Sequence, residues 1–271
     1  MTSDYQLATD LGAVRLYRHG PAAKIELNRP ERLNAWNSDL GIALRETVLA
    51  VAADETVRAL LITGAGRAFS SGADLRARGE PDPEGLSDSY ELLTQRYHPI
   101  MTSIRTMPKP VVAAVQGAAA GIGLSLALSC DLVIGAESAY FLLAFVNVGL
   151  VPDGGSSLLV PSRIGFARAA ELAMLGERLP SARALDWGLI NRVVPDEELL
   201  PQAEALTTRL ANGPTQSYAG TKRELNAWLY GPMAEQLELE AQLQREMGGT
   251  ADVAEGIAAF QERRPPEFTG R

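Results

Sequence analysis

Residues 110–129, PVVAAVQGAAAGIGLSLALS, carry no charged side chain, and this run restricts the possible folds more than any other segment. It is about long enough to span a membrane, but Gln116, three glycines and two serines dilute its hydrophobicity. Pro110 and Gly117 divide it into a short β-type segment and a short helical segment. We therefore expect a buried strand followed by a buried helix in a globular core, and no membrane span.

Strand-like and helix-like segments alternate on both sides of this run. AVRLYRHG and AAKIELN predict two paired strands, an amphipathic helix begins at Ser38, and VRALLITGAG and DLVIGA predict further buried strands. After about residue 196 the pattern becomes helical, with polar and apolar residues mixed. Strands that alternate with helices favour an α/β fold. We predict an α/β core over residues 1–195 and a C-terminal helical region over residues 196–271.

Composition excludes several classes of function. With 271 residues, 46% of them hydrophobic, the chain is long enough to bury a large core. A net charge of −8 gives no electrostatic basis for binding nucleic acid or an anionic membrane. Cys130 is the single cysteine and lies in an apolar run, so we expect a buried thiol and no disulfide framework. The sequence MTSDYQLATD lacks the pattern of a signal peptide, which predicts a cytoplasmic protein.

One glycine motif raises the possibility of dinucleotide binding. Gly117, Gly121 and Gly123 follow a predicted strand and precede a predicted helix, as in a pyrophosphate-binding turn. Tyr218 and Lys222 form a Y-x-x-x-K pair, as in short-chain dehydrogenases. However, the glycine motif should belong to the first βαβ unit, and here over a hundred residues of α/β sequence precede it. The oxidoreductase hypothesis is therefore disfavoured.

Asp153 is the only charged residue between Glu137 and Arg163. It follows a proline and precedes two glycines, so it lies on a turn between apolar segments. Burial among apolar side chains disfavours a charged carboxylate and raises its pKa into a range useful for proton transfer. The alternative is a turn residue whose side chain caps a helix that begins near Gly154.

Five segments together resemble the enoyl-CoA hydratase/isomerase, or crotonase, superfamily. They are IELNRPERLNAWN, LLITGAGRAFSSGADL, KPVVAAVQGAAAGIGLSLALSCDLVIGA, VGLVPDGGSS and ALDWGLINRVV, in the order that the superfamily uses. The resemblance implies a spiral of ββα units, a C-terminal helical region that makes trimer contacts, and acyl-CoA thioester substrates. It also implies a homotrimer or a dimer of trimers, with no metal and no cofactor beyond the coenzyme A of the substrate.

Thioester chemistry through an enolate requires stabilisation of a negative charge on the carbonyl oxygen, and two backbone N–H groups can provide it. By resemblance, the donors are the N–H groups of Ala73 in SSGADL and of Ile122 in AGIGL. The second donor follows Gly121 at the predicted start of a helix, where the helix dipole adds positive potential. The superfamily usually has glycine at the second position, so we expect the side chain of Ile122 to shape the pocket.

The acidic residues depart from the hydratase pattern. Hydratases of this superfamily use two glutamates, and the matching positions here hold Ser125 and Phe145. Addition of water needs a base for the water and an acid for the α-carbon, so neither position supports hydration. Isomerases that resemble the phenylacetate-pathway enzymes carry a single Asp at the turn where Asp153 lies. We therefore predict enoyl-CoA isomerisation with Asp153 as the proton shuttle; a hydratase and a non-catalytic acyl-CoA-binding subunit remain the alternatives.

The resemblance also suggests residues that contact the substrate. Arg32 matches a basic position that approaches the CoA phosphates in relatives, and Phe145 is expected to form an apolar wall over the acyl group. His98 precedes the predicted strand that begins at Pro110. A related dehalogenase has a catalytic histidine at about the same distance before its corresponding strand. The residues predicted to bind substrate or CoA are Arg32, Leu33, Asp74, Leu75, His98, Gly121, Ser125 and Phe145.

Overall fold

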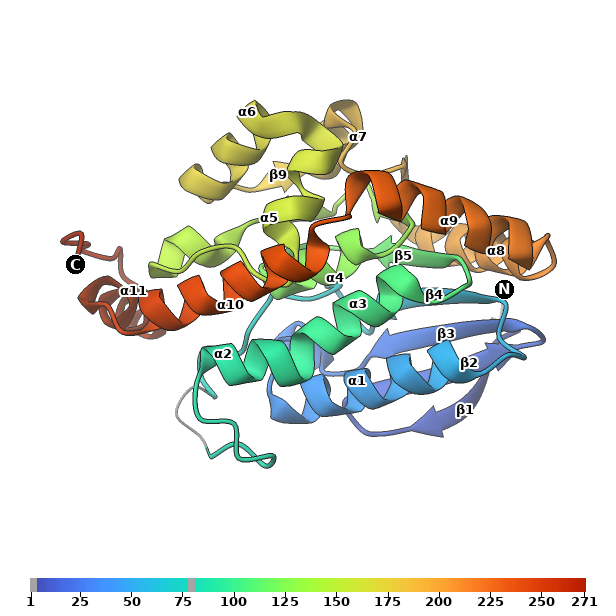
Figure 1. Ribbon diagram of the computed structural model, residues 1–271, viewed down its shortest axis with the longest axis horizontal. Coiled ribbons are helices and arrows are strands. Elements are labelled where there is room, and N and C mark those ends of the chain that lie inside the picture. Colours follow the sequence, from blue (N-terminus) through green and yellow to red (C-terminus); the bar gives the residue numbers. More distant parts are fainter. Residues whose placement is uncertain (1–3, 78–80) are drawn as a thin grey trace.

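The computed structural model describes residues 4–77 and 81–271, and its main element is a seven-stranded sheet (Figure 1). The strand order is β1-β2-β3-β4-β5-β7-β10. β1 to β3 pair antiparallel, and the remaining strands pair parallel. The strands are β1 (Gln6–Asp10), β2 (Val14–His19), β3 (Ala22–Leu27), β4 (Ala59–Gly64), β5 (Val111–Val115), β7 (Leu132–Ala136) and β10 (Arg192–Val194). The predicted pairing of the β2 and β3 segments is confirmed.

A second, three-stranded sheet consists of β6 (Ala118–Ala120), β8 (Tyr140–Leu142) and β9 (Leu179–Pro180). The chain alternates between the two sheets: β5 joins the large sheet, β6 joins the small one, and helix α4 (Ile122–Ser129) follows. The next pair, β7 and β8, repeats this pattern. These ββα units confirm the predicted α/β architecture. The sequence predicted one strand and one helix over residues 110–129, so the short strand β6 was missed.

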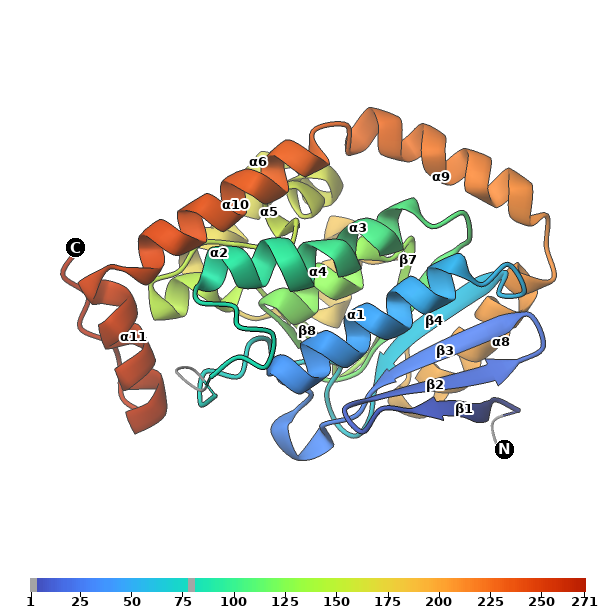
Figure 2. The same ribbon diagram turned by 60° about the horizontal axis from the view of Figure 1, so that its bottom comes forward.

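Helices cover both faces of the main sheet. α1 (Ser38–Ala53) packs against β2 and β3, and the side chain of Asn37 caps it by accepting a hydrogen bond from the N–H of Leu40. α8 (Leu199–Ala211) packs against β3, β4 and β5, and Figure 2 shows it behind the strands, with α1 in front. All six residues of β4 are buried, as in a parallel strand covered on both faces.

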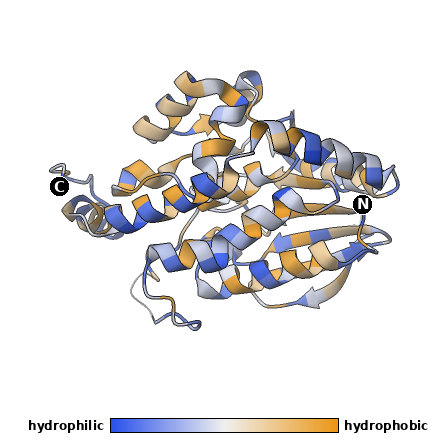
Figure 3. Cartoon of the chain, in the orientation of Figure 1, coloured by the Kyte–Doolittle hydropathy of each residue, from blue (hydrophilic) through white to orange (hydrophobic). Residues whose placement is uncertain are grey.

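A long helical rod crosses the molecule above α1 (Figure 2). It comprises α2 (Ser89–Leu92), the π-helical turn η2 (Leu93–Tyr97) and α3 (His98–Thr106). α10 (Met233–Gly248), which carries both hydrophilic and hydrophobic residues (Figure 3), packs against α2 and η2. Short π-helical segments are frequent at functional sites because they displace side chains from the regular helical register.

The remaining elements complete the molecule. They are η1 (Pro30–Arg32), η3 (Ala144–Val148), α5 (Ser156–Leu159), α6 (Pro161–Leu175), α7 (Ser181–Trp187), η4 (Asp196–Glu198), α9 (Thr215–Leu229) and α11 (Ala251–Glu262). Among the described residues, no helix is both long enough and apolar enough to span a bilayer. Cys130 is buried and free, as predicted. Lys222 is also buried, with its Nζ bonded to the carbonyl oxygens of Ile104 and Lys109 and to Asp131, so this half of the Y-x-x-x-K motif has a structural role.

Candidate active site

Two backbone segments, residues 70–73 and 118–122, lie side by side; we refer to them as the oxyanion segments. Ser70 forms a parallel bridge with Ala119. The N–H of Ser70 donates to the carbonyl of Ala118, and the N–H of Ala120 donates to the carbonyl of Ser70, both at 2.9 Å. A Cβ at Gly72, whose φ is +93°, would lie 3.0 Å from the carbonyl oxygen of Ala120. The close approach of the two segments therefore depends on glycine.

Each oxyanion segment presents one unused amide. Trp36 exchanges backbone hydrogen bonds with Gly72 and Asp74, which turns the N–H of the intervening Ala73 away from Trp36. Ile122 is the first residue of α4, so its N–H has no intrahelical acceptor. Among the described residues, neither N–H has an acceptor within hydrogen-bonding distance. Both predicted donors are therefore available to a ligand, and the helix dipole adds positive potential at the second.

Asp153 lies on the segment that we call the acid turn, residues 151–157. Its Oδ2 accepts a hydrogen bond of 3.0 Å from Nε2 of Gln244 on α10. Its Oδ1 is buried and has no hydrogen-bond partner among the described residues. Burial raises the pKa of the Asp153 carboxyl well above its usual range, and the nearby charge of Glu240 raises it further. A carboxyl with one oxygen held and the other free suits proton transfer.

The capping hypothesis for Asp153 is wrong. α5 begins at Ser156, and no side chain of the preceding residues caps it. The N–H groups of Gly155 and Ser157 donate instead to the carboxylate of Glu240, at 2.7 and 3.0 Å. Because Glu240 comes from α10, far away in sequence, the local sequence around Asp153 could not reveal this cap.

Two predicted residues of α4, Ser125 and Ile122, contact the acid turn, and Phe145 lies beside the neighbouring Gly121. The hydroxyl of Ser125 donates to the carbonyl of Asp153 at 2.7 Å. A Cβ at Gly154 would lie 2.5 Å from Cδ1 of Ile122, so the side chain of Ile122 packs directly against the turn. The ring of Phe145, which is 8% exposed, lies within 3.9 Å of where a Cβ of Gly121 would be. The site therefore combines two amide donors, an apolar wall and one carboxyl.

Arg32 and Leu33 lie beside the first oxyanion segment. Arg32 is exposed at the end of η1, and Leu33 follows with φ +53°. The N–H of Ser71 donates to the carbonyl of Leu33 at 2.9 Å. An exposed arginine whose backbone adjoins this segment can bind an anionic group there.

Asp74 and Leu75 continue from the same segment. The Asp74 carboxylate forms an ion pair with Arg29 at 3.1 Å, which stabilises the loop that follows Ala73. The carbonyl of Leu75 accepts a hydrogen bond from Gln261 on α11 at 3.2 Å. The C-terminal helix therefore contacts the chain two residues beyond Ala73.

His98 and Tyr97 are neighbours on the helical rod but have different surroundings. Burial lowers the pKa of His98 to about 4. The charge of Glu238 acts in the opposite direction and raises it. Burial raises the pKa of Tyr97, and so does the charge of Asp153. The Tyr97 ring packs edge-on against Trp36 at 4.9 Å. The charge of Asp153 therefore acts on Tyr97. Sequence reasoning missed Tyr97.

Gln244 and Glu240 were also missed. Their spacing of four residues places them on one face of a helix, but nothing in the sequence indicates that this face meets Asp153. Both are only 2% exposed.

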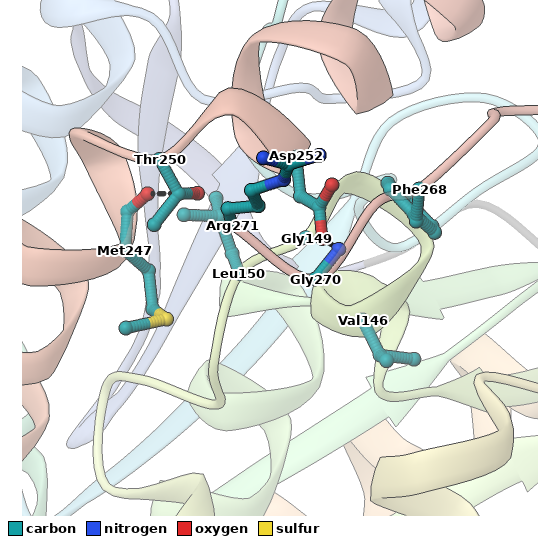
Figure 4. A pocket seen from close by; sticks show the side chains of 9 residues that line it. All are labelled: Val146, Gly149, Leu150, Met247, Thr250, Asp252, Phe268, Gly270 and Arg271. Atoms are coloured by element: carbon teal, nitrogen blue, oxygen red, sulfur yellow. Dashed lines mark hydrogen bonds between the residues drawn. The ribbon is translucent and has the colours of Figure 1, made fainter.

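A separate pocket of about 360 Å³ lies between η3 and the C-terminal tail (Figure 4). The Asp252 carboxylate holds the tail there by accepting hydrogen bonds from the N–H groups of Thr269 and Gly270. The residues that line this pocket include none of the predicted site residues. Within residues 4–77 and 81–271, no group of three or more His, Cys, Asp or Glu side chains is arranged to hold a metal ion.

Comparisons with known proteins identify the family of this chain. The sequence model of the enoyl-CoA hydratase/isomerase family matches residues 18–271. The chain is 43% identical to the 1,2-epoxyphenylacetyl-CoA isomerase of Escherichia coli, over 91% of this chain and 94% of the relative. It is also 43% identical to a probable enoyl-CoA hydratase of Rhodobacter capsulatus, over 92% and 95%.

The fold has close structural relatives as well. A crystal structure of an enoyl-CoA hydratase from Mycobacterium avium subsp. paratuberculosis superposes with a TM-score of 0.86 and 36% identity, covering 95% of this chain and 98% of that one. The ββα units, the paired amide donors and the sequence matches lead to one conclusion. The chain belongs to the enoyl-CoA hydratase/isomerase family of the crotonase superfamily.

Proposed function

We propose that this protein is a cytoplasmic enoyl-CoA isomerase that moves a double bond through a thioester enolate. The observation that supports this most is the buried Asp153 carboxyl, which has a raised pKa and an unpartnered Oδ1. Ser125 and Phe145 occupy the positions at which hydratases of the superfamily carry glutamates. One carboxyl suffices for isomerisation, because the proton removed from one carbon can be returned to another.

In the proposed mechanism, the thioester carbonyl oxygen accepts hydrogen bonds from the N–H groups of Ala73 and Ile122. Asp153 removes a proton from the α-carbon of a 3-enoyl-CoA, and the negative charge spreads onto the carbonyl oxygen. The same carboxyl then delivers the proton to the γ-carbon, which leaves the double bond between the α- and β-carbons. A single oxyanion donor typically contributes about 3 kcal/mol of transition-state stabilisation.

Coenzyme A enters as part of the substrate, and the proposed chemistry needs no metal or redox cofactor. We place the CoA phosphates near Arg32 and Leu33, with Asp74 and Leu75 continuing the same wall and Phe145 over the acyl group. The exposed position of Arg32 beside the oxyanion segment supports this assignment.

The relatives support both the proposal and its main competitor, because one is named an isomerase and the other a probable hydratase. Turnover of 3-enoyl-CoA and of 2-enoyl-CoA, measured for the natural protein and for Asp153→Asn, distinguishes the hypotheses. We expect isomerisation and solvent-deuterium exchange at the substrate carbons, both reduced at least ~100-fold in Asp153→Asn. Acyl-CoA affinity should stay within a few-fold.

Three results would contradict the proposal. Water addition without isomerisation would identify a hydratase. Tight acyl-CoA binding with neither reaction would identify a binding subunit. Normal exchange in folded Asp153→Asn would show that Asp153 is not the proton shuttle.

We further propose a homotrimer or a dimer of trimers, assembled through the C-terminal helical region. Trp228 on α9 is 85% exposed and Phe260 on α11 is 54% exposed, which suits apolar contacts between subunits. Truncation after Gly248 removes α11 and should lower the oligomer mass and weaken CoA binding together. Unchanged mass and affinity, measured by light scattering and calorimetry, would refute this role of α11.

A further inference from the structure

Gln244 bonds to the acid turn at two points. Its Nε2 donates to the carbonyl of Val151 at 2.6 Å and to Oδ2 of Asp153 at 3.0 Å. One amide group thus fixes both the backbone before Asp153 and one oxygen of the Asp153 carboxyl. Because Oδ2 is held in this way, the unpartnered Oδ1 is the oxygen left to accept or deliver a proton.

Glu240 holds the other end of the same turn from one helical turn earlier on α10. Its two carboxylate oxygens accept hydrogen bonds from the N–H groups of Gly155 and Ser157, and the Ser157 hydroxyl also donates to it. These contacts place a second carboxyl close to Asp153 without connecting the two directly. The turn therefore carries hydrogen bonds from α10 both before and after Asp153.

We propose that Gln244 and Glu240 are positioning residues that orient and electrostatically adjust the Asp153 carboxyl from helix α10. This inference rests on the proposed function of Asp153 as the proton shuttle. It assigns part of the catalytic geometry to the C-terminal helical region, for which we otherwise propose oligomer contacts and a contribution to CoA binding.

The two residues act on Asp153 with opposite sign. The Gln244 N–H donates to the carboxyl and favours its ionised form, because a hydrogen bond to an anion stabilises the anion. The negative charge of Glu240 disfavours the ionised form. The charge of Asp153 also acts on Tyr97, and burial raises the pKa of Tyr97, so this side chain stays neutral. Loss of Gln244 should therefore raise the pKa of Asp153, and loss of the Glu240 charge should lower it.

The test compares Gln244→Met, Glu240→Gln and a control, Gln242→Met. Methionine keeps the length of glutamine but cannot donate. Gln242 is exposed on the same helix and bonds to Glu238, so the same substitution there leaves the acid turn intact. We expect Gln244→Met to lower kcat about 10- to 100-fold with KM within about twofold, because small misplacements of a reacting group cost that much. Gln242→Met should match the natural protein.

The pH profile separates positioning from simple loss of structure. The acidic limb of kcat should move to higher pH in Gln244→Met and to lower pH in Glu240→Gln. A lower kcat in both variants with no movement of the limb would overturn the proposal. So would a parallel rise in KM.

A readout without turnover keeps this inference distinct from the proposed function. The Asp153 carboxyl can be titrated by carbon-13 NMR in aspartate-labelled protein, with its signal assigned by its loss in Asp153→Asn. Opposite pKa shifts in the two variants would uphold the role of α10 even if the protein proved to be a hydratase. Unchanged titration alongside confirmed isomerase activity would refute the role of α10 and leave the isomerase assignment intact.

Discussion

The oxyanion segments and the acid turn contact each other at the candidate site, but different kinds of contact hold them in place. The oxyanion segments are aligned by backbone hydrogen bonds, such as those between Ser70 and its neighbours on residues 118–120. The acid turn is held mostly by side chains: Gln244 and Glu240 from α10, and Ser125 from α4. Side-chain substitutions should therefore affect the first region through shape and the second through charge and lost polar contacts.

The two regions also differ in how they respond to pH. The oxyanion donors are amides, which do not titrate between pH 4 and 9. Two buried carboxyls lie at the acid turn, Asp153 within it and Glu240 bonded to it from α10, and both have raised pKa values. Proton-dependent behaviour of the site should therefore originate at the acid turn.

The largest effect should come from removing an oxyanion donor. Ala73→Pro deletes an N–H group, and turnover should fall by about two to three powers of ten. Ala73→Ser keeps the amide and should change turnover only a few-fold. Steady-state kinetics on folded protein, checked by circular dichroism, tests this contrast. Normal turnover by Ala73→Pro would show that the donor lies elsewhere.

The next effect concerns stability and pH at the acid turn. Burial raises the pKa of Glu240 from its ordinary value of 4.5 to about 7. The folded protein therefore holds this proton more tightly than the unfolded chain does. The protonated Glu240 carboxyl contributes fully to the free energy of unfolding below pH 4.5. This contribution, up to about 3 kcal/mol, is lost as pH rises through 7.

Urea unfolding at several pH values measures this loss. The difference in free energy of unfolding between Glu240→Gln and the natural protein should grow in favour of the variant between pH 4.5 and 7. Ala73→Ser, in the oxyanion segment, should show the same pH dependence as the natural protein. A constant difference over this range would mean that Glu240 titrates normally.

A smaller effect should appear where the two regions touch. Gly154 has φ +63°, and an added Cβ would lie 2.5 Å from Cδ1 of Ile122 and 2.9 Å from Cβ of Ser125. Gly154→Ala should lower the free energy of unfolding by about 1–3 kcal/mol, through backbone strain and overpacking.

The side chain of Ile122 provides the control for that prediction. Ile122→Val removes Cδ1, so the double variant should be more stable than the sum of the single effects predicts. Strict additivity in chemical denaturation would show that Ile122 and Gly154 are not coupled.

The smallest effect is expected at Ser125. Its hydroxyl donates to the carbonyl of Asp153, but the hydroxyl of Ser156 donates to the same oxygen at 2.8 Å. Ser125→Ala should therefore cost only about 1 kcal/mol of stability and a few-fold in turnover. A loss as large as that of Asp153→Asn would show that Ser125 takes part in the chemistry.

Local pattern was enough to predict much of this protein. The uncharged run over residues 110–129 indicated a buried core segment, and the alternation of strands and helices indicated the α/β class. The isolation of Asp153 in an apolar stretch marked it as unusual. These inferences succeed because hydrophobic periodicity and turn residues depend on neighbours in the chain.

Other features depended on contacts between distant segments. Residues 118–120 were expected to belong to the helical segment that follows Gly117, but they form strand β6 because Tyr140–Leu142 pairs with them. The cap of α5 could not be predicted because Glu240 lies more than 80 residues beyond it. The edge-on packing of Tyr97 against Trp36 likewise depends on how the helical rod packs.

The sequence by itself determined the fold class, through the alternation of strand and helix patterns along the chain, and it singled out Ala73, Ile122 and Asp153 as candidate site residues, through short motifs. Only the tertiary structure decided how the Asp153 carboxyl is held and how far its pKa rises. The reason is physical: burial, hydrogen-bond partners and nearby charge are properties of the space around a group. At Asp153 that space is formed by Gln244 and Glu240, from a helix that begins 80 residues later at Met233.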